Sequence, residues 1–262
     1  MKNKELEEEV HLLSIKKESK TIRNKNIVVT QPTFFPYSGF FAQFFFIDEI
    51  IFLDDVQFDK NSWQKRNKIK TKDKFIYLRI DTQTKGKYLQ KINEVKIDYN
   101  EKKKKKLINT IYFNYKKSKY FEEYFGSIEE ILNKNYEKLI DINLEIIYLV
   151  NKIIGVQDKK ILFSSQLGTK EKKFKLIEEI YLKTKATSLL STSGVMQYFP
   201  KNLPYNMNVK FFEYNDNVHP YEQLFGKFIP RLSIIDLLFN CGPESITNMK
   251  KNFKIIDNGK KI

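Results

Sequence analysis

Cysteine, histidine and tryptophan are scarce in this chain, whose 262 residues include one Cys, two His and one Trp. A single cysteine excludes an internal disulfide and any cluster of cysteines around a metal. Two histidines and one cysteine also make no zinc site with a recognised spacing, so the sequence offers no metal site. A chain with one thiol is typical of a reducing compartment, and we therefore expect a cytoplasmic protein.

Long apolar runs are also missing. No stretch of about 18 or more apolar residues occurs, so the sequence predicts no membrane span. The N-terminus, MKNKELEEEVHLL, is acidic and polar, whereas a signal peptide has a basic region followed by an apolar one. We accordingly expect neither export nor insertion into a membrane.

Arginine is scarce as well, although the formal net charge is +15. Only 4 of the 47 basic residues are arginines, and the others are lysines. The positive charge favours anionic partners such as nucleotide phosphates, nucleic acid or an acidic membrane face. A lysine-rich surface is also what an AT-rich genome encodes, so the total charge does not by itself indicate a function.

Hydrophobic residues make up 41% of the chain and aromatic residues 15%, which indicates a globular protein. Apolar segments with the periods of strands and helices alternate, which predicts an α/β fold with a parallel sheet. We expect strands at 27–30, 50–53, 75–80, 95–97, 161–164, 188–191 and 209–214, and helices at 40–47, 172–184 and 233–240. The expected parts are a helical appendage at 1–24, an α/β part at 25–99, a helical subdomain at 100–158, a second α/β part at 159–250 and a tail at 251–262. Five consecutive lysines at 102–106 are expected to be a solvated helix face.

The loop after the first expected strand is the first site candidate. In open α/β sheets, ligands bind outside the carboxyl ends of the strands, where loops meet helix N-termini that favour phosphate. The loop at 31–40, QPTFFPYSGF, has two prolines that end the strand. The alternative is that its prolines and aromatic residues only form a rigid turn. The candidate ligand contacts are Gln31, Pro32, Tyr37, Ser38 and Gly39.

A second candidate follows the next expected strand, where Asp54 and Asp55 are adjacent. Successive side chains in extended backbone point to opposite sides, so we expect one carboxylate to face the site and the other to cap or pair. A carboxylate in a partly buried pocket is suited to general-base catalysis, and a Lys with an Arg is suited to bind a diphosphate. The alternative is a surface loop with ordinary, weak ion pairs. The candidate substrate contacts are Gln57, Lys60, Trp63, Arg66 and Asn67.

The third candidate is the segment HPYEQLFGKFIPRLSIID, which begins at His219. Histidine titrates near neutral pH and is therefore suited to proton transfer, although a lone histidine is also commonly structural. Tyr221 and Gln223 are its expected substrate-positioning neighbours. Ser193 and Gly194, in a polar turn after an expected strand, are further candidates for ligand binding.

Four segments together resemble the WbqC-like family, whose members recur among bacterial O-antigen and capsule biosynthesis proteins. They are IVVTQPTFFPYSGFFAQFFFIDEIIFLDDVQFDKNSWQKRNKIK (27–70), SSQLG (164–168), TSGVMQYF (192–199) and YEQLFGKFIPRLSIIDLLFNCG (221–242). The resemblance covers about residues 27–243 and implies a Rossmann-like parallel sheet that opens as in the nucleotidylyltransferases, with a helical subdomain. Gly39 stands where the glycine of their signature motif lies, but Phe40 replaces the neighbouring histidine. The resemblance therefore implies a nucleotide-binding pocket and does not extend to adenylyl transfer.

By that resemblance we expect an enzyme that transfers an acyl or aminoacyl group to the amino group of a nucleotide-linked amino sugar in surface polysaccharide biosynthesis. The catalytic candidates for taking the proton of the amine are Asp54, Asp55 and His219. The sequence leaves the acyl donor open among a thioester, an aminoacyl-tRNA and an amino acid activated by ATP.

The alternative is a non-catalytic module that binds a nucleotide sugar or RNA, or a scaffold of a glycan assembly pathway. No recognised RNA-binding signature is present, so nucleic acid is not expected as a partner, although tRNA stays open. The N-terminal helix could join copies of the chain into a homo-oligomer.

Overall fold

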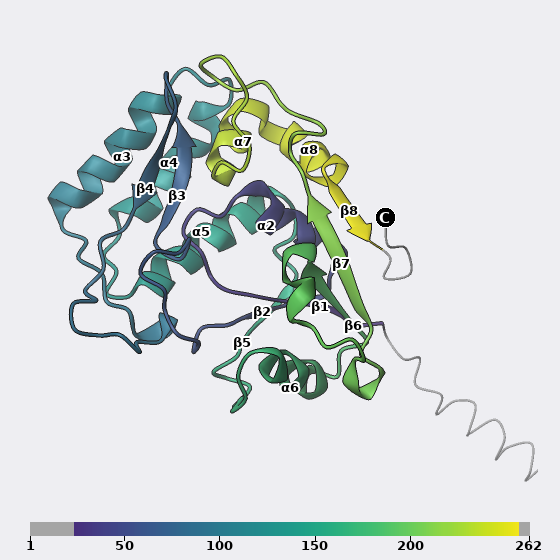
Figure 1. The fold of residues 1–262 in the computed structure, drawn as a ribbon. Coiled ribbons are helices and arrows are strands. Elements are labelled where there is room, and N and C mark those ends of the chain that lie inside the picture. The colour runs from purple at the N-terminus through teal and green to yellow at the C-terminus, as the bar shows by residue number, and fades with distance from the viewer. Residues whose placement is uncertain (1–23, 257–262) are drawn as a thin grey trace, which may run out of the picture.

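The computed structural model describes residues 24–256, which form a six-stranded sheet in the order β5-β2-β1-β6-β7-β8 (Figure 1). Neighbouring strands run parallel except β8, which pairs antiparallel with β7. Short apolar runs such as those of β1 and β2 are buried on both faces, as parallel strands covered by helices must be. The strands are β1 (Asn26–Thr30), β2 (Glu49–Phe52), β5 (Lys160–Phe163), β6 (Ser188–Thr192), β7 (Val209–Tyr214) and β8 (Phe253–Ile256).

Alternate side chains of the strands enter two hydrophobic cores, one on each face of the sheet. Val28 and Ile50 enter the core that helices α2, α5, α7 and α8 cover, whereas Ile27 and Ile51 enter the core under α6. The chain therefore has the Rossmann-like α/β fold that the sequence predicts. The helices are α2 (Ser38–Ala42), α5 (Leu139–Ile153), α6 (Phe174–Thr184), α7 (Ile234–Cys241) and α8 (Ser245–Lys251).

Between β2 and β5 the chain leaves the sheet and forms an antiparallel hairpin and further helices. The hairpin consists of β3 (Arg66–Lys70) and β4 (Phe75–Arg79), and the helices α3 (Glu101–Tyr115) and α4 (Phe121–Asn133) precede α5. Buried side chains of α3 and α4 join the same core as α5 and the sheet. No helix within residues 24–256 is long and apolar enough to cross a membrane.

Two expected elements differ in the structure. The segment at 95–97 makes single bridges, Thr82 with Ile97 and Lys96 with Lys138, because its apolar side chains fill the core beside the helices and do not pair in a ladder. The expected tail at 251–262 contains β8, since Phe253 stacks on Phe212 and on Phe46 and so holds the edge strand against β7. The expected appendage at 1–24 lies outside the described residues except for its last residue.

The lysine run at 102–106 is only partly a solvated face. Lys104 is 2% exposed, and its ammonium group donates a 2.8 Å hydrogen bond to the Glu101 carboxylate and a 3.1 Å hydrogen bond to the carbonyl oxygen of Asn133. Its flanking residues Lys102, Lys105 and Lys106 are exposed, as expected. Lys104 thus anchors α3 to the end of α4.

Candidate functional site

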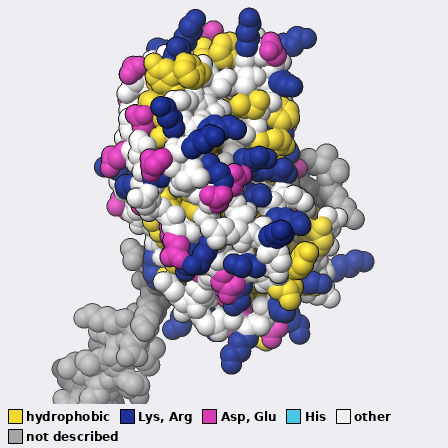
Figure 2. Space-filling model, turned by 90° about the vertical axis from the view of Figure 1, so that its left-hand side faces the viewer, with side chains coloured by type: hydrophobic (Ala, Val, Ile, Leu, Met, Phe, Trp, Pro, Cys, Tyr) yellow, Lys and Arg dark blue, Asp and Glu magenta, His cyan; other side chains and the backbone are white. Residues whose placement is uncertain are grey.

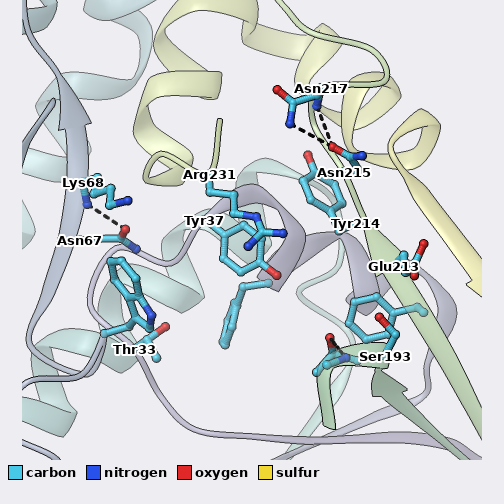
Figure 3. Close-up of a pocket in the computed structure, with 15 residues that line it drawn as sticks. Thr33, Tyr37, Asn67, Lys68, Ser193, Glu213, Tyr214, Asn215, Asn217 and Arg231 are labelled. Atoms are coloured by element: carbon cyan, nitrogen blue, oxygen red, sulfur yellow. Dashed lines mark hydrogen bonds between the residues drawn. The ribbon is translucent and has the colours of Figure 1, made fainter. Parts of the chain in front are cut away.

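A cleft of about 820 Å³ opens beyond the carboxyl ends of β1, β6 and β7. The chain passes from β1 to β2 on one side, whereas β6 lies on the other side of β1. The direction in which strands are added thus reverses between β1 and β6, and open α/β sheets bind ligands at such a point. The cleft is lined by Thr33, Tyr37, Phe40, Trp63, Asn67, Lys68, Thr192, Ser193, Gly194, Phe212, Glu213, Tyr214, Asn215, Asn217 and Arg231 (Figure 3).

The floor of the cleft is the turn into α2, packed against β7. The Tyr214 hydroxyl donates a 2.9 Å hydrogen bond to the buried Ser38 hydroxyl, and the rings of Tyr37 and Tyr214 meet edge to face. A Cβ on Gly39 would lie 2.4 Å from the Tyr37 ring and 2.7 Å from the Tyr214 ring. Only glycine fits this close approach. Ser38 and Gly39 therefore shape the floor and do not line the cleft.

One wall of the cleft is the β3–β4 hairpin. The side-chain amide of the buried Asn67 donates a 2.7 Å hydrogen bond to the carbonyl oxygen of Phe35 and accepts a 2.8 Å hydrogen bond from the backbone amide of Lys68. Asn67 therefore fixes the hairpin to the loop after β1. The Lys68 ammonium lies 5.7 Å from the centre of the Trp63 ring, and Trp63 is 48% exposed. No carboxylate among residues 24–256 forms an ion pair with Lys68. This wall therefore offers the cleft a cation and an aromatic face.

The guanidinium of Arg231 enters the cleft above Tyr37 from the loop between β7 and α7 (Figure 3). The backbone of Arg231 has a left-handed φ of 56°. The buried carboxylate of Asp216 stabilises this conformation because it accepts a 2.6 Å hydrogen bond from the Arg231 backbone amide. Burial raises the pKa of the Tyr37 hydroxyl, although the charge of Arg231 opposes that shift. In the described part of the chain, no side chain hydrogen bonds or ion-pairs with this guanidinium. Lys68 and Arg231 thus supply two cations to the cleft, and the only carboxylate whose charge acts on Arg231 within residues 24–256 is the buried Asp216.

A buried polar network anchors the loop that carries Arg231. Lys70 is buried, and its ammonium group donates a 3.0 Å hydrogen bond to the Gln223 side chain and a 2.6 Å hydrogen bond to the carbonyl oxygen of Lys227. The Tyr221 hydroxyl donates 2.8 Å to the carboxylate of Asp236. Tyr221 and Gln223 were expected to position substrate, but neither lines the cleft, and both hold the loop in place.

Asp54 and Asp55 lie at the end of β2 and are bonded to the turn after β5. Asp54 is 5% exposed and accepts hydrogen bonds from the Ser165 hydroxyl, the Ser165 amide and the Asn93 side chain, and it shares the single proton of the Ser164 hydroxyl with Asp55. Burial raises the pKa of Asp54, but these hydrogen bonds outweigh it and hold the pKa below its usual value. Asp55 also accepts from Ser164. Neither carboxylate lines the cleft, so their catalytic role stays a prediction without support from its geometry.

His219 is exposed and does not line the cleft. Its backbone amide donates 2.9 Å to Asn252, and its carbonyl oxygen accepts from Asn248 and Asn252. The segment is therefore held to α8 by its backbone, and within residues 24–256 the imidazole makes no hydrogen bond or ion pair that supports the predicted proton transfer. Among the described residues, no group of three or more His, Cys, Asp or Glu is arranged to hold a metal ion.

The other expected substrate contacts divide between the cleft and its surroundings. Tyr37, Trp63, Asn67, Ser193 and Gly194 line the cleft. The remaining candidates make hydrogen bonds elsewhere. The Gln31 side chain accepts one of 2.8 Å from Gln64, and the Pro32 carbonyl oxygen accepts one of 3.3 Å from Asn143. The Gln57 side chain donates one of 3.0 Å to the carbonyl oxygen of Tyr88. Lys60 lies over Tyr88, and Arg66 donates 2.7 Å to the carbonyl oxygen of Asn61. The structure thus places Lys68 and Arg231 in the cleft where the sequence suggested Lys60 and Arg66.

The profile of the WbqC-like protein family matches residues 31–248. The chain belongs to the WbqC-like protein family. It is also 29% identical over 224 residues to Uncharacterized protein Rv1507c of Mycobacterium tuberculosis, a match that covers 84% of this chain and 96% of that protein. No solved structure matches the chain significantly.

Every residue that lines the cleft lies within the part of the chain that matches the WbqC-like family. The cleft residues that sequence reasoning missed include Lys68, Tyr214 and Arg231. Arg231 carried one usable signal, because arginine is rare in this chain and occurs here directly after a proline in a segment without a regular period. Tyr214 carried none, since a tyrosine at the end of an apolar strand is an ordinary core residue.

Proposed function

We propose that this WbqC-like protein binds a nucleotide-linked amino sugar in the cleft and transfers an acyl or aminoacyl group to the sugar amine, in surface polysaccharide biosynthesis. The observation that carries the proposal is the pair of cations, Lys68 and Arg231, that reach one cleft without a direct ion pair to a carboxylate in the described part of the chain. A cation left unpaired in a partly buried cleft favours an anionic ligand.

A nucleotide sugar has chemical groups that suit each wall of the cleft. A planar guanidinium binds phosphate oxygens in pairs, so Arg231 with Lys68 suits the diphosphate. The half-exposed Trp63 suits stacking on a base or a sugar face. Hydroxyl and amide side chains of Thr33, Ser193, Asn215 and Asn217 suit the sugar hydroxyls. A volume of about 820 Å³ lies within the range of roughly 300–1,000 Å³ for small-molecule pockets.

In acyl transfer, the C–N bond forms as the sugar amine loses a proton, and the acyl carbon then loses the thiol, tRNA or nucleotide group of its donor. The step needs a proton acceptor for the amine and a hydrogen-bond donor for the oxyanion of the tetrahedral intermediate. Glu213 is exposed and is the one carboxylate among the lining residues of this cleft, so we assign it the role of base. The side-chain oxygen of Asn215, Oδ1, accepts hydrogen bonds from Asn217. The side-chain nitrogen of Asn215 and the guanidinium of Arg231 are therefore the groups that we assign to stabilise the oxyanion.

Mass spectrometry tests the proposed reaction. The protein is incubated with a panel of nucleotide-linked amino sugars and each of the three donor classes: a thioester, aminoacyl-tRNA, or an amino acid with ATP. The proposal predicts that one pair yields the sugar with its mass increased by one acyl group. Binding of the nucleotide sugar without modification by any donor would support the non-catalytic alternative, and the absence of binding would contradict the proposed site.

A further inference from the structure

The outer face of the β3–β4 hairpin carries alternating cations and aromatic rings. The register pairs Arg66 with Arg79, Lys68 with Tyr77, and Lys70 with Phe75. Cross-strand partners share one face of a hairpin, so these side chains form a single surface. Lys70 is covered by the loop that its ammonium binds, and the rest of the surface adjoins the cleft through Lys68 and Trp63.

The exposed aromatic rings on this face are braced by the cations beside them. The Arg66 guanidinium lies 4.8 Å from the centre of the Tyr77 ring, and the Lys68 ammonium lies 4.5 Å from that of Phe75. The Trp63 and Tyr77 rings are 6.3 Å apart, and they are 48% and 42% exposed. Two neighbouring aromatic side chains are thus partly exposed to solvent next to positive charge, and Arg66 covers part of the Tyr77 ring.

Positive charge on this face is only weakly balanced. Arg79 lies 3.8 Å from Asp81, and Asp81 is shared with Lys103 at 3.0 Å. Burial lowers the pKa of Lys65, and the charges of Arg79, Arg66 and Lys60 lower it further against the opposing effect of Asp81. Four cations therefore act on one another here, an arrangement that a polyanion would stabilise.

Arginine on this hairpin is unexpected from the composition. A bias towards lysine would produce a general positive surface, but 2 of the 4 arginines of the chain face each other across this hairpin and a third enters the adjoining cleft. Guanidinium groups differ from ammonium groups because they stack on rings and grip phosphate in a fixed plane.

The helix beside the hairpin also exposes lysines. Helix α3 packs beside β4 and exposes Lys102, Lys105 and Lys106. Figure 2 shows this side of the molecule, where Lys and Arg side chains spread over much of the surface, with Asp, Glu and exposed hydrophobic side chains among them. A free nucleotide needs one ring and one charged clamp, whereas this surface presents two exposed rings and a longer row of cations.

We propose that the outer face of the hairpin binds RNA, with bases stacked on Trp63 and Tyr77 and phosphates held by Arg66, Arg79 and the lysines beside them. Single-stranded nucleic acids are bound in this way, by aromatic platforms within a positively charged track. The surface runs into the cleft, so a bound RNA end lies beside the acceptor site. Of the donor classes that the sequence left open, this placement favours the RNA-linked one, a consequence that rests on the proposed function.

Fluorescence anisotropy with a labelled, unstructured RNA of about 20 nucleotides tests the inference at about 150 mM salt. We expect saturable binding whose affinity falls steeply with salt. The double substitution Tyr77→Ala with Arg79→Ala should weaken binding at least about tenfold and reduce the salt slope by about 0.7, the contribution of one phosphate contact. The matched control, Lys201→Ala with Tyr205→Ala, removes one exposed cation and one exposed ring elsewhere and should leave affinity unchanged.

Three results would overturn the inference: no binding by the unaltered protein, equal weakening in the two double variants, or tighter binding of DNA of the same sequence than of RNA. Calorimetry of nucleotide-sugar binding by the hairpin variant gives a separate result. If this variant still binds the nucleotide sugar, its weaker RNA binding is not the result of a damaged fold or cleft. If the unaltered protein binds the nucleotide sugar but not RNA, the RNA-binding surface is rejected and the proposed function still stands.

Discussion

The hydroxyl of Tyr115 on α3 donates a 2.7 Å hydrogen bond to the carboxylate of Asp236 on α7, a side chain with no exposed surface. Tyr221 donates to the other oxygen of the same carboxylate. Burial raises the pKa of Asp236 to about 6, although both tyrosines and Lys70 act to lower it. One buried carboxylate thus joins α3, α7 and the loop that brings Arg231 to the cleft.

This raised pKa predicts a pH dependence of stability. An unfolded aspartate titrates near pH 4, so between about pH 4 and pH 6 the folded protein holds a proton that the unfolded chain releases. The free energy of unfolding should therefore fall as the pH rises through this window. Asp236→Asn cannot titrate, so its free energy of unfolding relative to wild type should improve by up to about 3 kcal/mol across the window. Urea denaturation at successive pH values measures the difference, and a difference that stays constant with pH would contradict the assignment.

Gly39 predicts a steric effect on the floor of the cleft. Gly39→Ala should lower the free energy of unfolding by about 1–3 kcal/mol, because its Cβ would overlap the rings of Tyr37 and Tyr214. Gly126→Ala is the matched control, since Gly126 lies exposed inside α4 with no atom close to the new Cβ. The control should gain about 0.5–1 kcal/mol from helix propensity. Equal stability changes for the two variants in thermal or urea denaturation would show that the floor is not closely packed.

The hydrogen bonds that Asp54 accepts predict a loss of stability when its carboxylate is removed. Asp54→Asn should cost about 1.5–3 kcal/mol at neutral pH, the range for hydrogen bonds to a charged group. Because the pKa of Asp54 is lower in the folded protein than in the unfolded chain, its carboxylate stabilises the fold at neutral pH. This stabilisation is lost as the pH falls below about 4, the pKa of an unfolded aspartate. Asp73→Asn is the control, because Asp73 is exposed and its side chain has no hydrogen bond within the described residues. Equal stability of the two variants at neutral pH would remove Asp54 from the structural role.

The position of Glu213 predicts a loss of rate without a loss of binding. Removing a general base typically costs about 10² to 10⁴ in rate and spares ground-state binding, so Glu213→Gln should bind nucleotide sugar and turn over slowly. The sequence assigns this role to Asp54, Asp55 or His219, and the Asn variant of each, assayed in the same way, tests that prediction. Full turnover by Glu213→Gln, with a loss in one of the other three, would favour the assignment made from sequence.

The sheet could be predicted from sequence where strands are apolar runs between turn residues, as in β1, β2 and β7. The hairpin strand β3, RNKIK, could not, because only one of its five side chains is apolar. Lys70 is buried there by Gln223 and the carbonyl oxygen of Lys227, partners more than 150 positions away, and no local pattern encodes such contacts. The antiparallel strand β8 could not be predicted for a related reason. Its four residues pair with β7 because the Phe253 ring stacks on the rings of Phe212 and Phe46, which lie far away in the sequence.

The location of the cleft could be predicted in part. Tyr37 follows from the rule that ligands bind where strands end, and Trp63 and Asn67 from the cluster of aromatic, basic and amide side chains after the second strand. The expectation that one of Asp54 and Asp55 faces a site stays a prediction, because both accept hydrogen bonds from serines after β5. The sequence could not show that Asp54 bonds Ser164 and Ser165, because the pairing of β2 with β5 brings the two turns together across 110 residues. Arg231 reaches the cleft only through a loop that Asp216 and the Lys70 network fix in space.

Calorimetric titration of the protein with a nucleotide-linked amino sugar tests the central claim, that Arg231 binds the anionic group of a substrate in the cleft. Arg231→Ala should weaken binding by about 1.5–3 kcal/mol, the range for a charge-assisted hydrogen bond, or about 10- to 150-fold in Kd. Arg79→Ala is the matched control, an exposed arginine outside the cleft, and should bind as wild type does. Unchanged affinity in a folded Arg231→Ala protein, or equal losses in both variants, would contradict the account.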